Sequence, residues 1–265
     1  MRIGIFDSGL GGLAIAQAII RELPQYDYLY LGDTKRVPYG NRSQETVHQF
    51  TSEALHYLFE EDCQLVILAC NTASAEALRK TQQEYVPNHY PDRNVLGVII
   101  PTAEIAVEGG ARRVGVLATA STVSSEAYAR EVQRQNPNVK VFQQAAPLLV
   151  PLIENDGLKY AEPVVDDYLA PLLEEAVDAI ILGCTHYSWI KQLVRAKTGV
   201  RVVAQDELIP GKVATYLERH PEHESKLGRH GERLYRVTDL NVGYQALAQR
   251  LSGSSDLEFE KVELD

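Results

Sequence analysis

Two of the three cysteines in this 265-residue chain occupy matching settings. Cys70 and Cys184 each follow an apolar run and one small residue, and each precedes hydroxyl or amide residues of the types that begin helices. A thiol there would meet free backbone N–H groups and the positive end of a helix dipole, which favour the thiolate over a reference pKa of about 8.5. Cys63 follows three acidic residues, lacks this setting and is expected to be structural.

A pair of thiols suits the inversion of a carbon centre. The reaction removes a proton from one face of the carbon and returns one to the other face. Two thiols on opposite walls of a cleft, one ionised and one protonated, can do this without a moving base, because a thiol pKa lies near neutrality. Two alternatives compete. Most free cysteines are small buried core residues, and Cys70, Cys184 and His186 could act as zinc ligands, although no Cys-x-x-Cys pair accompanies them.

Two titratable residues are expected to assist the thiols. Asp7 ends the first expected strand and should lie near Cys70, while His186 follows Cys184 by two positions and titrates near neutrality. The alternatives are a helix cap for Asp7 and a surface imidazole for His186. Polar side chains of suitable type to stabilise a carboxylate and a developing carbanion lie nearby: Ser8, Asn71, Thr72 and Thr185.

Short apolar runs alternate with helical patterns, which predicts βαβ units and parallel sheets covered by helices on both faces. The expected strands are Ile3–Phe6, Tyr28–Leu31, Leu65–Ala69, Val95–Ile99, Val114–Leu117, Val139–Gln143, Ala179–Leu182 and Val200–Val203. The expected helices include Gly12–Glu22, Ser43–Glu61, Ala73–Tyr85, Ser124–Gln135, Tyr160–Glu175 and Tyr187–Thr198.

A weak internal repeat divides the chain. Residues 4–8 resemble 115–119, and residues 67–72 resemble 181–186, so the two cysteines are equivalent. Two copies of one α/β unit would face each other across a cleft at the carboxyl ends of their strands, where ligands collect. We expect a discontinuous first domain, 1–97 plus 209–265, and a second domain, 98–208.

The tail after Pro210 is expected to pack back on the N-terminal half. It contains two helical patterns, Pro210–Arg219 and Val242–Leu251, and a strand-like run, Leu257–Leu264. The polar segment His220–Arg233 is interpreted as an exposed loop, with a histidine-rich metal site as a less favoured alternative.

Composition narrows the classes of function. The net charge of −10 and the absence of basic runs argue against nucleic acid and anionic membranes as partners. No secretory signal, no long apolar segment and no disulfide framework appear, so a reduced, cytoplasmic protein is expected. No lysine has a setting that demands pyridoxal phosphate.

A glycine-rich turn, residues 7–12, follows the first strand and could hold an anion. Its spacing matches neither a dinucleotide-binding fingerprint nor a Walker A loop, so a carboxylate fits better than a nucleotide. Residues 37–40 form a second turn, which is either a donor loop at the same sheet edge or a plain structural turn.

The chain resembles the bacterial glutamate racemases. The matching motifs are residues 6–13, 32–34, 36–40, 69–74, 97–99, 118–119 with 122, 147–151 with Glu154, and 182–187, in the order found in that family. The resemblance implies two flavodoxin-like domains with parallel sheets related by pseudo-symmetry, an active site in the cleft between them, and often a homodimer. It implies cofactor-independent racemisation of glutamate, which supplies D-glutamate for peptidoglycan.

The resemblance also implies roles for individual residues. Cys70 and Cys184 would be the two acid/bases, assisted by Asp7 and His186, with a supporting role for Glu154. Asp7 and His186 would also contact the substrate, together with Ser8, Pro38, Tyr39, Gly40, Asn71, Thr72, Thr119, Thr122 and Thr185. No metal is expected.

Two segments depart from the family pattern. Ser188-Trp189 replaces the usual Pro-Leu behind Cys184, and residues 204–207 replace the usual Val-Asp-Ser, which puts the domain contacts there in doubt. With no extension before the first strand, regulation by a cell-wall precursor is not expected. An aspartate or other amino-acid racemase, or a non-catalytic amino-acid-binding protein, remains an alternative function.

Overall fold

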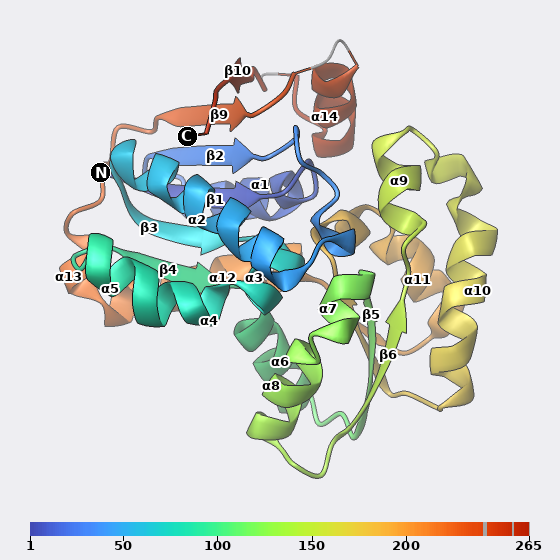
Figure 1. Ribbon diagram of the computed structural model, residues 1–265. Coiled ribbons are helices and arrows are strands. Elements are labelled where there is room, and N and C mark those ends of the chain that lie inside the picture. Colours follow the sequence, from blue (N-terminus) through green and yellow to red (C-terminus); the bar gives the residue numbers. More distant parts are fainter. Residues whose placement is uncertain (241–242, 256, 265) are drawn as a thin grey trace.

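The computed structural model describes residues 1–240, 243–255 and 257–264. Within these ranges, six strands form a first parallel sheet (Figure 1). Its order is β10 (Glu260–Lys261), β9 (Arg233–Val237), β2 (Tyr28–Gly32), β1 (Arg2–Asp7), β3 (Cys63–Leu68) and β4 (Asn94–Gly97). The central strands β1, β2 and β3 are buried along almost their whole length, as their continuous apolar sequence predicts.

A second parallel sheet repeats the topology of the first. In the described residues its order is β6 (Lys140–Ala145), β5 (Arg113–Ala118), β7 (Ala179–Gly183) and β8 (Arg201–Val203). This arrangement matches β2-β1-β3-β4 strand for strand, so β3 and β7, which lead into the two cysteines, are equivalent. The predicted fold class, two flavodoxin-like α/β units related by pseudo-symmetry, is confirmed.

Helices cover both faces of each sheet. Hydrophobic clusters on the two faces of the first sheet include residues of α1 and α12 on one side and of α2 and α3 on the other. Those of the second sheet include residues of α9–α11 on one side and of α6 and α8 on the other. The α-helices are α1 (Gly12–Glu22), α2 (Gln44–Glu60), α3 (Asn71–Glu76), α4 (Leu78–Lys80), α5 (Val86–His89), α6 (Ile99–Glu108), α7 (Ala120–Ser124), α8 (Ala127–Gln135), α9 (Leu149–Glu154), α10 (Ala161–Glu174), α11 (Lys191–Thr198), α12 (Gln205–Arg219), α13 (Pro221–Glu224) and α14 (Tyr244–Ser252).

Several expected element boundaries are wrong. The predicted helix Ala73–Tyr85 is broken into α3, α4 and a π-helical turn, Thr81–Tyr85. The predicted strand Val95–Ile99 ends at Gly97, because Ile99 already begins α6. The predicted helix Tyr187–Thr198 divides into a 3₁₀ turn, Thr185–Trp189, and α11.

The tail differs most from its prediction. Helix α12 begins at Gln205 and contains Pro210 inside it, so proline did not mark the start. The expected loop 220–233 contains the short helix α13 and leads directly into β9, which was not predicted. The predicted start of the next helix at Val242 lies outside the described residues.

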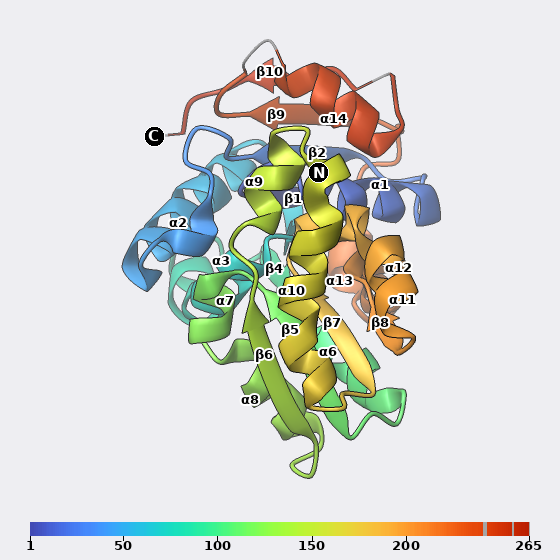
Figure 2. The ribbon, with the colours of Figure 1, turned by 90° about the vertical axis from the view of Figure 1, so that its right-hand side faces the viewer.

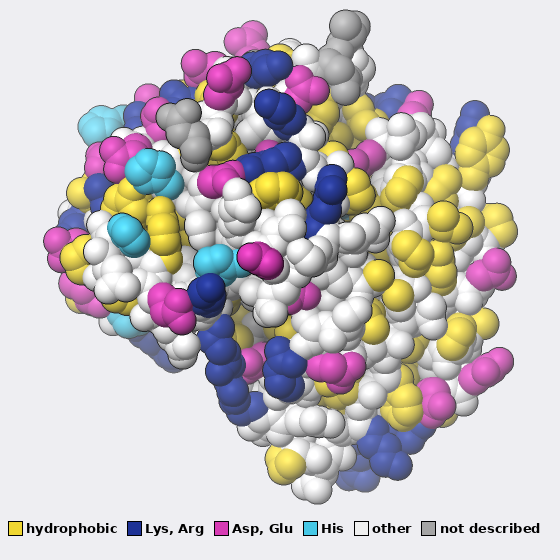
Figure 3. Space-filling view, viewed as in Figure 1, with side chains coloured by type: hydrophobic (Ala, Val, Ile, Leu, Met, Phe, Trp, Pro, Cys, Tyr) yellow, Lys and Arg dark blue, Asp and Glu magenta, His cyan; other side chains and the backbone are white. Residues whose placement is uncertain are grey.

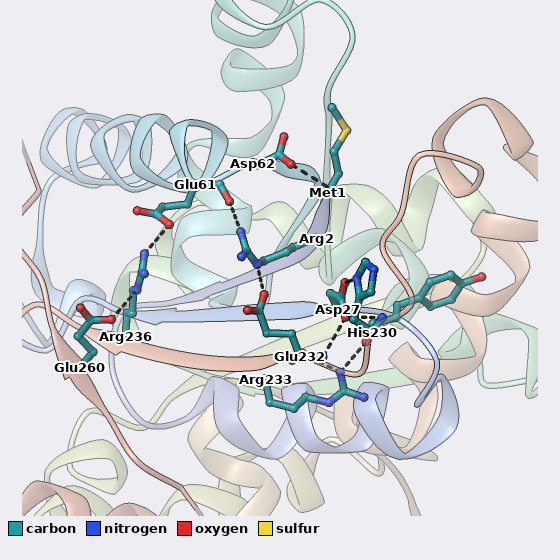
Figure 4. A network of polar contacts seen from close by, with 11 residues as sticks. Met1, Arg2, Asp27, Glu61, Asp62, His230, Glu232, Arg233, Arg236 and Glu260 are labelled. Atoms are coloured by element: carbon teal, nitrogen blue, oxygen red, sulfur yellow. Dashed lines mark hydrogen bonds and ion pairs between the residues drawn. The ribbon is translucent and has the colours of Figure 1, made fainter.

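Strand β9 lies beside β2, and β9 and β10 form the edge of the first sheet that is remote from the second sheet (Figure 2). Polar contacts tie this segment to the amino ends of the early strands (Figure 4). Arg2 pairs with Glu232 at 2.6 Å, and Asp27 accepts the backbone N–H groups of His230 and Glu232 at 2.9 and 2.8 Å. These contacts lie at the amino ends of the strands, so they do not occupy the carboxyl ends, where the predicted site residues lie. No helix in the described ranges has both the length and the apolar composition needed to cross a bilayer.

Candidate active site

One cavity collects side chains from the carboxyl ends of both sheets. Its volume is about 530 Å³, with the open solvent at its mouth included. It brings together most of the residues predicted for the site: Ser8, Pro38, Tyr39, Gly40, Cys70, Asn71, Thr72, Thr119, Cys184, Thr185 and His186. Asp7 and Thr122 do not line the cavity. Asp7 lies behind Thr185, and Thr122 lies behind Thr119.

Cys70 follows β3 and caps α3. Its sulfur accepts the Ala73 N–H at 3.5 Å, as the sequence predicts, and its thiol donates to Ser8 Oγ at 3.5 Å. The Ala73 N–H lowers the pKa of Cys70, as predicted, but this contact does not decide the net pKa. Burial, followed by the charge of Asp7, raises the pKa of the Cys70 thiol to about 12, despite the opposing contacts with Ser8 and Ala73. Cys70 is therefore suited to hold a proton at neutral pH.

Cys184 has a different environment from Cys70. It precedes the 3₁₀ turn Thr185–Trp189 rather than an α-helix, and its sulfur accepts no capping N–H. Instead, its Sγ lies 3.7 Å from Nδ1 of His186. The predicted contact of the sulfur with backbone N–H groups is thus replaced by a contact with an imidazole, because the short turn places the His186 ring beside the sulfur.

His186 links Cys184 to a carboxylate. Its Nε2 lies 2.8 Å from Oε1 of Glu154, at the end of α9. Burial lowers the pKa of His186, but the contacts with Cys184 and Glu154 outweigh it and raise that pKa well above its usual 6.5. The Trp189 ring meets the imidazole edge-on, with centroids 5.9 Å apart, so this departure from the family pattern packs against His186. Cys184 therefore faces an imidazolium.

Asp7 joins the two halves of the protein. The carboxylate is fully buried at the end of β1, where Oδ1 accepts the Gly9 N–H at 3.0 Å and Oδ2 accepts the Thr185 hydroxyl at 3.1 Å. Burial raises the pKa of Asp7, against the opposing effects of His186 and these hydrogen bonds. Asp7 lies close enough to raise the pKa of Cys70, while its hydrogen bonds tie it to the wall that carries Cys184.

Gly11 of the glycine-rich turn and Gly40 allow close packing between the two halves of the protein. A Cβ on Gly11 would lie 2.2 Å from Thr185 Oγ1 and 2.6 Å from His186 Nδ1. A Cβ on Gly40 would lie 2.7 Å from Cβ of Thr119 on the other half. Glycine at these two positions lets the two walls of the cavity approach each other.

Threonines from both halves meet at the rim. The Thr72 hydroxyl lies 3.1 Å from that of Thr119 and 3.4 Å from that of Thr122. Thr119 also caps α7 by accepting the Thr122 N–H at 3.4 Å. Thr122 thus supports Thr119 from behind the cavity surface. The Tyr39 hydroxyl donates to the buried carboxylate of Asp33, which fixes the ring against the same cavity.

Several neighbours of the site were not predicted from the sequence. Further lining residues are Val37, Asn41, Pro147, Val150 and Pro151. Gln205 bonds to Asn71 directly behind the cavity, although it was noted only as a departure. Its position just after β8 could have indicated that Gln205 lies near the site, because residues that follow parallel strands meet at one edge of the sheet.

The chemistry available here is proton transfer. Two thiols, one beside an imidazolium and one with a raised pKa, face a small cavity lined by hydroxyl and amide groups. Among the described residues, no group of three or more His, Cys, Asp or Glu side chains is placed to hold a metal ion. Fold and site together define a two-lobed α/β enzyme of the amino-acid racemase class.

Comparison with known proteins agrees with this class. The model of the Asp/Glu/Hydantoin racemase family matches residues 7–205, and the chain belongs to this family. It is 37% identical to a glutamate racemase of Persephonella marina over 100% of this chain and 98% of that protein. It is 38% identical to one of Geobacter metallireducens, covering 99% of this chain and 97% of the relative.

A solved structure has the same fold over the whole chain. The glutamate racemase of Francisella tularensis in complex with D-glutamate superposes with a TM-score of 0.88 at 30% identity, covering 100% of this chain and 98% of that one. The similarity therefore extends over both sheets and the tail.

Proposed function

We propose that this protein racemises L- and D-glutamate without a cofactor, using Cys70 and Cys184 as its two acid/bases. The observation that carries the proposal is that the thiols follow equivalent strands, β3 and β7, and line one cavity. The similarity to glutamate racemases along the whole chain supports glutamate as the substrate.

Burial and Asp7 keep the proton on Cys70, so we infer that Cys184, whose Sγ lies 3.7 Å from His186 Nδ1, starts the cycle as the base. The Cys184 thiolate removes the Cα proton from the enantiomer that presents it to that wall. Cys70 then gives its own proton to the opposite face of the carbanion, and the opposite enantiomer leaves. The reverse reaction starts from the Cys70 thiolate and the Cys184 thiol.

Polar groups of the cavity stabilise the carbanion. Negative charge that develops at Cα spreads into the substrate carboxylate, so donors aimed at that carboxylate act on the transition state. Ser8, Asn71 and Thr72 supply such donors at the wall, and Tyr39 and Pro38 exclude water beside them. Glu154 keeps His186 charged, and Asp7 holds Thr185 in place.

The decisive measurement is circular dichroism of L-glutamate incubated with the purified protein, with no added cofactor. The signal should decay to zero, and in D₂O the product should carry deuterium at Cα. An unchanged optical signal together with calorimetric binding of glutamate would favour a binding protein instead and refute the proposal.

Alanine variants test the two-thiol scheme. Cys70→Ala and Cys184→Ala should fold and lose racemisation in both directions, because each direction needs both groups. Cys63→Ala is the matched control, since Cys63 is also buried but lies at the amino end of β3. Full turnover in either of the first two variants would contradict the assignment.

Relative rates on L-glutamate and L-aspartate test the substrate. One methylene contributes only about 1–3 kcal/mol to discrimination, so measured rates decide better than sequence patterns. A higher kcat/KM for L-aspartate than for L-glutamate would show that aspartate is the preferred substrate of the same mechanism.

In the cell, we propose a cytoplasmic homodimer that supplies D-glutamate for peptidoglycan. On the face shown in Figure 3, hydrophobic side chains gather over α9 and α10. Leu148 and Tyr160, which precede these helices, are 56% and 60% exposed, and such a patch suits a second copy of the chain. Sedimentation of the protein tests the dimer. We also propose the domain division expected from the sequence, 1–97 plus 209–265 and 98–208.

A further inference from the structure

A buried chain of hydrogen bonds connects helix α6 to the residue that follows Cys70. The Thr102 hydroxyl donates to the Val98 carbonyl at 2.6 Å, and Gln205 Nε2 donates to Thr102 Oγ1 at 3.3 Å. Asn71 Nδ2 in turn donates to Gln205 Oε1 at 2.7 Å. Thr102, Gln205 and Asn71 are at most 2% exposed, so water does not compete for these contacts.

The chemistry of the first link sets the direction of the others. A hydroxyl has a single hydrogen, and the Thr102 hydrogen is used by a carbonyl, which can only accept. Thr102 must therefore accept from Gln205, which places the Gln205 NH₂ group toward α6. The Gln205 carbonyl oxygen then accepts from Asn71, and only the Asn71 NH₂ group can bond to it. Gln205 Nε2 faces Asn71 as well, on the side of Oδ1.

Tyr128 completes the orientation of Asn71. Its hydroxyl donates to Asn71 Oδ1 at 2.6 Å, and Gln205 Nε2 lies 2.8 Å from the same oxygen. The oxygen thus has two donors, while Asn71 Nδ2 has one acceptor among the described residues and keeps a second hydrogen. Asn71 also lines the cavity beside Cys70. The second N–H of the Asn71 amide is therefore an available hydrogen-bond donor, and a carboxylate can accept from it.

We propose that Gln205 is a positioning residue that holds the Asn71 amide with an N–H toward the substrate carboxylate. The proposal rests on the proposed function and adds to it the residue that orients one carboxylate contact. It also gives a role to one position of the departure at residues 204–207. Gln205 touches no reacting atom and acts through Asn71.

The test compares two identical substitutions at buried glutamines. Gln205→Leu removes the acceptor that holds Asn71. Gln64→Leu is the matched control, because Gln64 is fully buried in β3 and bonds to the Asp92 carbonyl away from the cavity. We expect KM for both enantiomers to rise and kcat/KM to fall about tenfold or more in Gln205→Leu, because the oriented amide binds the carboxylate in the ground state and in the transition state. Both constants should stay unchanged in Gln64→Leu. An unchanged KM in a folded Gln205→Leu protein overturns the proposal.

Gln205→Glu supplies a second readout, and carries the test if Gln205→Leu fails to fold. A protonated carboxyl can donate and accept as the amide does. Its ionised form can only accept, so it would place a second acceptor against Asn71 Oδ1, where Gln205 Nε2 now donates. The ratio of the variant KM to the wild-type KM should therefore rise as pH increases, which a purely structural role would not produce. A ratio independent of pH overturns the proposal.

Failure of the proposed function is distinguishable from failure of this proposal. If the wild type does not turn over glutamate but binds it, calorimetry with D-glutamate replaces KM. Weaker binding in Gln205→Leu than in Gln64→Leu would still support the orienting role. A wild type that neither turns over nor binds glutamate overturns both.

Discussion

Gly11 offers a sharp test of how closely the two halves must approach. It precedes α1 with φ −54° and ψ −40°, a conformation that alanine adopts readily, so Gly11→Ala introduces no backbone strain. Its Cβ would nevertheless lie 2.2 Å from Thr185 Oγ1 and 2.8 Å from the His186 backbone nitrogen. An ordinary contact starts at 3.4 Å, so the segment after Cys184 must move away from α1 by roughly 1 Å.

Such a displacement acts on the thiol that His186 supports. A shift of about 1 Å in a reacting group can cost on the order of 100-fold in rate, so kcat should fall by about that factor. Overpacking should lower the free energy of unfolding by about 1–3 kcal/mol, and alanine is also a poorer N-cap of α1 than glycine.

The assay is polarimetric turnover of both enantiomers, together with thermal unfolding. Gly211→Ala is the matched control, because Gly211 lies inside α12 and its Cβ would meet nothing within 4 Å. This control should gain about 0.5–1 kcal/mol of stability and keep full activity. A Gly11→Ala protein with wild-type kcat would show that the two walls need not be so close, and the reasoning would fail.

Three further predictions concern the titrating groups. Glu154→Gln removes a charge that raises the pKa of His186, so the imidazolium should lose its proton at a lower pH. The alkaline limb of the plot of kcat/KM against pH should therefore shift to lower pH. An unshifted limb would contradict the pairing of Glu154 with His186. Iodoacetamide at pH 8 should alkylate Cys184 before Cys70, whose pKa is about 12, as peptide mapping can determine; the reverse order would reject the resting state. Cys63→Ala should keep kcat and KM while lowering the free energy of unfolding by about 1–3 kcal/mol in denaturant titration.

Much of the site followed from chain order alone. Cys70, Cys184 and Thr119 follow strands of an internal repeat, and parallel strands bring such residues to one edge whatever packs around them. The repeat also predicted that β3 and β7 would be equivalent. Element ends were less well predicted where tertiary contacts override local preference. Strand β9 was missed because it is short and follows a polar segment, and it is stabilised by pairing with β2, a contact 205 positions away along the chain.

The sequence by itself determined which groups are present and at which strand ends they lie, because apolar periodicity and turn chemistry are local properties. Only the tertiary structure decided what those groups experience. The helix-capping pattern at Cys70 favoured a low pKa, yet burial and Asp7 raise it. At Cys184 the sequence predicted assistance from His186 and a supporting role for Glu154, but only the structure shows that Glu154 lies behind the imidazole and bonds to its Nε2. Burial, charge and the direction of a hydrogen bond depend on residues distant in the chain, and so they appear only when both sheets are assembled.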